Sequence, residues 1–187
     1  MEPFEYVVVL TSLILGLGIA QILTGVSDII SHWKQIKFSL PHGIYIMVVF
    51  LIHIQEWWIN YQYSKELMVW TLPVVLSILV FPILLYIQAR MLFPTGSRSG
   101  ETDMDAYFKD QWRWLYSIGT ITVMVSIWHN IFLSQIPITD QFQFIAYILV
   151  YLAFIFLNVK NQKAHAIFVL LQLIGQIAFI VTEKNTL

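Results

Sequence analysis

Long runs of apolar residues, broken at intervals by single polar ones, are the main pattern along this chain. Six runs are close to the roughly 20 residues that a helix needs to cross the hydrocarbon core of a bilayer. The predicted spans cover residues 5–31, 42–63, 67–92, 113–136, 141–159 and 165–182. The pattern predicts an all-α, polytopic membrane protein, a bundle of six transmembrane helices that forms one domain over residues 1–187.

The composition supports this class and excludes several others. Hydrophobic residues make up 58% of the chain and charged residues only 11%, whereas soluble domains are usually about 25% charged. The net charge of −1 gives no electrostatic basis for binding nucleic acid. Because the chain has no cysteine, it has no disulfides, no thiolate metal ligands and no thiol nucleophile. The lipid bilayer is therefore the expected partner.

The distribution of basic residues predicts the orientation of the spans. Eight of the ten Lys and Arg residues lie in or beside three predicted loops, 32–41, 90–113 and 160–164. Basic loops remain in the cytoplasm by the positive-inside rule. With six spans, both termini are then expected on the outer face of the membrane.

The first span carries a row of small residues. Ser12, Gly16, Ala20 and Thr24 recur at every fourth position, and small side chains on one helix face let two backbones approach closely. We predict that this row packs against another helix, either within the bundle or in a homo-oligomer. Gly18 lies off the row and is expected to tolerate a large side chain better than Gly16.

The opening stretch PFEYVVVLTSLILGLGIAQILTGVSDII, residues 3–30, resembles the N-terminus of small, uncharacterised multi-pass proteins of bacterial inner membranes. The resemblance covers little more than the first span. No function is attached to that group, so the resemblance implies only a location, the inner (plasma) membrane of a bacterial cell.

The third loop, residues 93–112, is the longest polar stretch. Thr102 and Asp105 have the spacing of a helix capping box, and apolar residues then recur at helical spacing as far as Leu115. This pattern predicts an amphipathic N-terminal extension of the fourth span. The alternative is a cytoplasmic gate or a docking site for a protein partner.

Polar residues within the second span are the first candidates for chemistry. His53, Glu56 and Asn60 fall at i, i+3 and i+7, so one helix face carries all three. A carboxylate in hydrocarbon costs several kcal/mol unless it is paired, hydrated or protonated. Glu56 either faces a polar interior or, beside Trp57 and Trp58, belongs to an interfacial aromatic belt.

Other spans add further polar residues at membrane depth. They are Gln21 in the first span, Thr122, Ser126, His129 and Asn130 in the fourth, and Gln172 and Gln176 in the sixth. Intramembrane polar and ionisable residues commonly mark pathways for ions or solutes. We therefore expect these side chains to form one polar path, in which Glu56 attracts cations and the histidines His53 and His129 exchange protons.

Three functions fit this inventory. The first is a channel or transporter for protons, cations or a small polar solute, with no cofactor. The second is a metal or haem protein, in which His53, Glu56 and His129 bind a divalent transition metal or the two histidines bind haem b. The third is an assembly or signalling subunit without chemistry of its own. No GxSG, HExxH or Walker motif is present to indicate an enzyme.

Overall fold

The structure is a computed structural model that describes residues 3–67, 69–94 and 102–182. Its helices are α1 (Pro3–Ser31), α2 (Leu40–Glu66), α3 (Leu72–Met91), α4 (Met104–Phe132), α5 (Phe142–Phe156) and α6 (Gln162–Thr182). Two short 3₁₀ helices, η1 (Trp33–Gln35) and η2 (Ile138–Gln141), lie before α2 and α5. Within the described residues, six segments are long and apolar enough to cross a membrane, one at each α-helix. The prediction of six apolar helices is thus confirmed, and it indicates a multi-pass membrane protein.

Several helix boundaries differ from the predicted spans by a few residues, and two of the differences have local reasons. Helix α3 begins at Leu72 rather than at residue 67, because the backbone of Thr71 is extended and Pro73 fits the first turn of a helix. Helix α5 ends at Phe156 rather than at residue 159. Asn158 there adopts a left-handed backbone with φ of 48°, a conformation that commonly follows a helix end.

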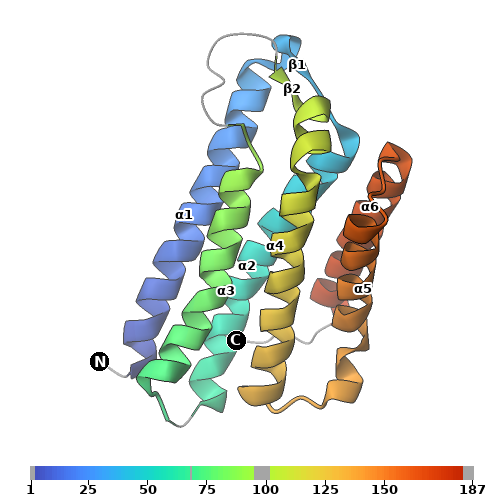
Figure 1. Ribbon diagram of the computed structural model, residues 1–187. Helices are drawn as coiled ribbons and strands as arrows, with labels where there is room; N and C mark the ends of the chain where they lie inside the picture. The colour runs from blue at the N-terminus through green and yellow to red at the C-terminus, as the bar shows by residue number, and fades with distance from the viewer. Residues whose placement is uncertain (1–2, 68, 95–101, 183–187) are drawn as a thin grey trace.

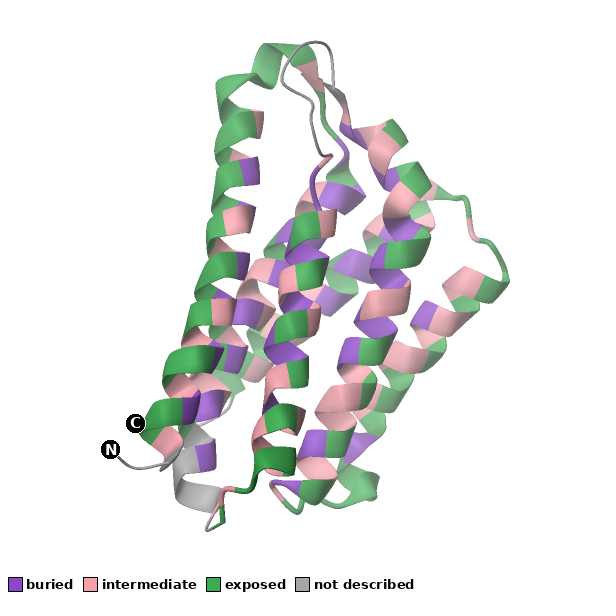
Figure 2. Ribbon diagram, turned by 60° about the vertical axis from the view of Figure 1, so that its left-hand side comes forward, coloured by how far each residue is buried: buried purple, intermediate pink, exposed green. Residues whose placement is uncertain are grey.

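Successive helices run in opposite directions through the bundle (Figure 1). Helix α1 packs on α2 and α3, α3 packs on α4, α4 packs on α5, and α6 packs along α2. We call the end that carries the two short strands the strand end. The opposite end is called the terminal end, because α1 begins there and α6 runs toward it (Figures 1 and 2).

The strand end joins the first and third loops. Strands β1 (Ile36–Lys37) and β2 (Thr102–Asp103) pair in parallel, and Lys37 Nζ donates to Asp103 Oδ2 at 2.9 Å. Asp103 Oδ1 also accepts from the Ala106 amide at 2.8 Å, so Asp103 caps α4 in place of the predicted Thr102. The Ala106 amide and the Lys37 ammonium hold the pKa of Asp103 below its ordinary value, and Asp103 raises the pKa of Lys37.

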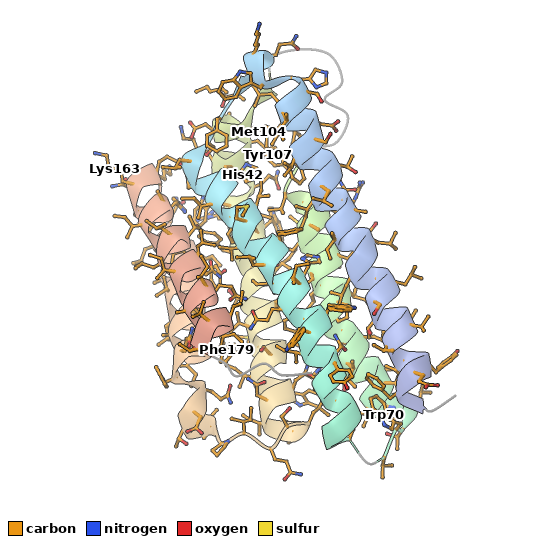
Figure 3. All side chains as sticks on the ribbon, turned by 180° about the vertical axis from the view of Figure 1, so that it is seen from behind. His42, Trp70, Met104, Tyr107, Lys163 and Phe179 are labelled. Carbon is orange, nitrogen blue, oxygen red and sulfur yellow. The ribbon has the colours of Figure 1, made fainter. Side chains whose placement is uncertain are left out.

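The N-terminal part of α4 forms the predicted amphipathic extension of the fourth span. Met104, Phe108 and Trp112 are buried on one face of it, and the His42 ring of α2 stacks on Phe108 with centroids 5.4 Å apart. His42, Met104 and Tyr107 lie together near the strand end (Figure 3). Whether the 93–112 segment binds a partner stays a prediction, and its residues 95–101 lie outside the described part of the chain.

Aromatic side chains fill the half of the bundle nearest the strand end. The largest of them with almost no exposure are Tyr45, Phe108, Tyr116 and Tyr151, and they come from α2, α4 and α5. Figure 2 shows the buried positions turned inward along the helices and the exposed ones turned outward. This half of the bundle is therefore closed by packed side chains.

The predicted packing row on α1 faces outward. A Cβ atom at Gly16 would meet no atom within 4 Å, and Ala20 and Thr24 are exposed. The buried face instead includes Gly18, where an added Cβ would collide with His53 Nε2. The interpretation of the row as a packing face within the bundle was wrong, because the large apolar residues on the adjacent face, such as Leu15, are buried instead.

Candidate functional site

A cavity of about 360 Å³ lies among α2, α4, α5 and α6, toward the terminal end. Its volume falls in the range of roughly 300–1,000 Å³ that is usual for sites that bind small molecules. Polar and charged side chains from all four helices and from the 134–141 segment line it. They are Gln55, Glu56, Tyr63, Thr122, Ser126, Asn130, Ser134, Asp140, Gln141, Gln143, Tyr147, Gln172 and Gln176. Phe179 of α6, also in the wall, lies in the half of the helix away from Lys163 (Figure 3).

Glu56 is the charged group deepest in the cavity wall. Its side chain is 5% exposed, while the neighbouring Trp57 is 52% exposed on the outer surface. Glu56 Oε1 accepts from Asn60 Nδ2 at 3.2 Å, and the same amide donates to the Glu56 carbonyl at 2.8 Å. Within the described residues, the other carboxyl oxygen has no hydrogen-bond donor. Glu56 therefore faces the bundle interior and not an outer aromatic belt.

Paired amides hold the cavity walls together. Gln176 Nε2 of α6 donates to Gln55 Oε1 of α2, and Asn130 Nδ2 of α4 donates to Gln141 Oε1 of η2 at 2.9 Å. Each pair joins two different elements across the cavity margin. These amides satisfy one another and still leave polar atoms on each side chain that can face a bound molecule.

Gln172 marks the inner limit of the cavity. Its Nε2 donates to the Tyr151 hydroxyl at 2.6 Å, while its Oε1 is buried without a partner among the described residues. Because the side chain lines the cavity and is only 6% exposed, this orphan acceptor is available to a bound donor. A buried acceptor without a donor costs about 1–3 kcal/mol.

Beyond Gln172, hydrogen-bonded side chains cross the bundle toward α3. We call Tyr45, Gln88, Tyr151 and Gln172 the tyrosine layer. Gln88 Nε2 donates to the Tyr45 hydroxyl at 2.6 Å, and Tyr45 donates to the Leu115 carbonyl at 3.2 Å. A Cβ added at Gly119 would lie 3.3 Å from both tyrosine hydroxyl oxygens, so only glycine leaves them full space. Tyr45 and Tyr151 belong to the aromatic core, so the layer joins that core to the cavity wall at Gln172.

The histidines predicted to share the site with Glu56 face other helices. His53 Nδ1 donates to the Val49 carbonyl at 2.7 Å, and its ring packs against Gly18 of α1. His129 Nε2 donates to the Ser77 carbonyl of α3 at 3.0 Å. The two rings satisfy neighbouring carbonyls, and neither lines the cavity. The predicted network of Glu56 with both histidines is therefore not formed.

The remaining predicted residues divide between the cavity and other places. Asn60 lies behind Glu56 as its donor. Gln21 lies elsewhere, where its Oε1 accepts from Arg90 Nη1 at 3.0 Å. The predicted residues that come together in the wall are Glu56, Thr122, Ser126, Asn130, Gln172 and Gln176.

The metal interpretation finds no support in the side-chain geometry. Among the described residues, no group of three or more His, Asp and Glu side chains is arranged to hold a metal ion. His53, Glu56 and His129 point toward α1, the cavity and α3 respectively. The same divergence argues against the two histidines as axial ligands of one haem.

Several wall residues escaped the sequence analysis. Gln55 is next to Glu56, but a rotation of about 100° per residue places it off the predicted face. Asp140 and Gln141 lie in η2, at the edge of a predicted span. Tyr147 approaches α6 because Gly175 has no side chain, since a Cβ there would collide with the tyrosine hydroxyl. Contacts between helices, rather than any pattern within one helix, bring these residues together.

Comparisons with protein-family models, with curated proteins and with solved structures found no significant match for this chain.

Proposed function

We propose that this protein is a small transporter of a bacterial inner membrane, which admits a cation or a small polar solute into the cavity from the outer side. The observation that carries the proposal is the cavity itself, with a buried carboxylate in its wall and polar groups from four helices. Intramembrane ionisable residues that face a cavity are typical of solute and ion pathways.

The proposed orientation follows from charge. The strand end carries the loops with most of the basic residues, including Lys37 and Lys163 (Figures 1 and 3), so we place it in the cytoplasm by the positive-inside rule. The terminal end, and with it both termini and the cavity mouth beside Asp140, then faces outward. A homo-oligomer that buries the outward row of α1 is part of this proposal.

A carrier fits the arrangement better than an open channel. The cavity ends at the tyrosine layer, and the half of the bundle beyond it is filled with aromatic side chains. A continuous pore would need that layer to open. We therefore propose that the described conformation is open outward and closed inward, and that transport requires rearrangement at Tyr151 and Gln172.

The proposal is tested by permeation through liposomes that contain the purified protein. Swelling of the vesicles in isosmolar polar solutes and cation salts reports entry, and an entrapped pH dye reports proton flux. Because the natural chain has no cysteine, the variant Ser126→Cys carries one thiol, in the cavity wall, that a bulky thiol reagent can block. Thr71→Cys, with its thiol exposed between α2 and α3, is the matched control.

We expect at least one solute or ion to permeate, with a rate that falls about tenfold or more when the Ser126→Cys variant is modified. Modification of the Thr71→Cys variant should leave the rate unchanged. A protein that conducts none of the tested solutes, or a Ser126→Cys variant that conducts equally well after modification, would favour the scaffold or signalling alternative.

A further inference from the structure

The charge of the cavity has one sign. Glu56, which is buried, and Asp140, which is exposed, both line the cavity, and among the described residues no Lys, Arg or His side chain lines it. A cleft lined by charges of one sign concentrates ions of the opposite sign. The cavity therefore favours positively charged ligands and disfavours anions.

Glu56 lacks a counter-charge. Its one hydrogen-bond donor among the described residues is the neutral amide of Asn60, and the two salt bridges found in that part of the chain lie elsewhere. An ionised carboxylate held in a poorly hydrated wall is costly unless a cation pairs with it. A ligand that brings a cation to this point would relieve that cost.

Aromatic rings surround the same space. Those that line the cavity are Tyr63, Phe81, Phe142, Phe144, Tyr147 and Phe179. Aromatic faces attract ammonium groups, and they bind the apolar body of a ligand through burial of its surface. Gln172 Oε1, buried without a donor among the described residues, offers an acceptor for an N–H group.

The dimensions argue against a bare metal cation. A water molecule takes a share of about 30 Å³ in the liquid, so a cavity of about 360 Å³ greatly exceeds the needs of one ion. Hard cations such as Ca²⁺ also take about 6–8 oxygen ligands in a shell around them. Among the described residues of this wall, only one carboxylate is buried.

We propose that the cavity binds a small organic cation, an amine or quaternary ammonium with an apolar body, whose charged head pairs with Glu56. The aromatic rings hold the body of the ligand, and Asp140 attracts it to the mouth. This inference rests on the proposed function, because it names the class of solute that enters the same cavity.

The test uses three probes that share one aromatic body and differ in the head group: 2-phenylethylammonium, neutral 2-phenylethanol and anionic 3-phenylpropanoate. Thermal unfolding of the full-length protein in detergent is followed against probe concentration, since a ligand that binds the folded state raises the midpoint. We expect saturable stabilisation by the ammonium probe and little effect from the anion.

Variants locate the binding site. Glu56→Gln should weaken binding of the ammonium probe at least about tenfold, because a buried charge partner is lost. Asp140→Asn should weaken it less than about threefold at physiological salt, because an exposed charge is screened. Asp28→Asn removes the same charge from the exposed surface of α1 and should change nothing.

A second measurement leaves Glu56 intact. The thiol of the Ser126→Cys variant is modified with a quaternary-ammonium thiosulfonate and with its sulfonate counterpart, and the ratio of the two rates is divided by the same ratio for the Thr71→Cys variant. We expect this normalised ratio to exceed about 5, from a Coulomb attraction that survives partial screening. A ratio near 1 would overturn the inference, even if Glu56→Gln does not fold.

The outcomes separate the two proposals. Equal stabilisation by the ammonium and alcohol probes, unchanged in Glu56→Gln, would overturn the organic-cation inference and leave a transporter of neutral solutes. No stabilisation by any probe, with permeation that modification of the Ser126→Cys variant blocks, would also overturn only the inference. No stabilisation, no permeation and no labelling of the Ser126→Cys variant would overturn both.

Discussion

At the scale of single residues, several buried polar side chains bond to a nearby carbonyl, while Gln172 Oε1 and His53 Nε2 have no partner among the described residues. His53 bonds to a carbonyl one turn earlier on its own helix, and His129 bonds to Ser77 on α3. Ser77 is followed by Ile78, and the Ile78 carbonyl lacks its usual hydrogen bond within the helix because Pro82 has no amide hydrogen. Glu56 is also incompletely paired, since its only donor in that part of the chain is the Asn60 amide.

Substitution of two glycines tests which face of α1 is buried in the bundle. Gly18→Leu should lower the free energy of unfolding by about 1–3 kcal/mol, because the new side chain collides with His53 and the core repacks. Gly16→Leu should have almost no effect on a monomer, since its face is open. Thermal unfolding of the two variants in detergent makes the comparison.

The reverse order, with Gly16→Leu the more damaging, would mean that the outward row of α1 is buried in an oligomer that persists in detergent. Size-exclusion chromatography of the same samples separates this result from a wrong helix rotation.

At the scale of elements, the sequence predicts the number of helices well and their rotation poorly. Apolar length alone identifies six spans, and Pro73 and Asn158 explain two of the boundaries that differ. Because lipid and the protein interior are both apolar, hydrophobicity does not tell which face of a membrane helix is buried. For this reason the prediction that the row at Gly16 packs within the bundle was wrong. The polar residues of α2 and α4 also face different directions: His53 faces α1, Glu56 faces the cavity and His129 faces α3.

The Lys37–Asp103 pair gives the strand end a definite pH dependence. Since the pKa of Asp103 is lowered, its contribution is present above the ordinary value of 3.8 and is lost as the pH falls through the lowered value. Since the pKa of Lys37 is raised, its contribution is present below 10.5 and is lost as the pH rises through the raised value.

The variant Asp103→Asn keeps an acceptor for the Ala106 amide and removes the charge. Near pH 7 we expect it to unfold about 1 °C below the wild type, a small difference because the pair is exposed. Near pH 3 the two proteins should unfold at closer temperatures. A difference that grows on acidification would contradict the assigned ion pair, and thermal scans across pH give the answer.

At the scale of the whole molecule, the two ends of the bundle differ in packing and in charge. The strand end is closed by aromatic packing and by a parallel strand pair that ties two loops together. The terminal end contains the cavity, whose wall includes the exposed Asp140. The charge difference between the ends was predictable from the sequence, but the cavity was not, because it depends on α6 packing along α2.

The proposed orientation has a direct test in cells. A reporter fused after Gly100 should score as cytoplasmic, and a reporter fused after Leu187 should score as external, because basic loops are retained in the cytoplasm. Reversal of both signals would place the cavity mouth inside the cell. The same signal from both fusions would contradict an odd number of crossings between them.

The packing of α6 along α2 also bears on how the protein is made. Helix α6 leaves the ribosome after the other five, yet it supplies the cavity wall that holds Gln172 and Gln176. Until it arrives, Gln55 lacks its amide partner and Glu56 lies beside an unfilled gap in the membrane, which is an unfavourable state. A nascent chain interrupted before α6 would thus display polar groups to lipid, a defect that membrane quality-control proteases can recognise and that completed synthesis removes.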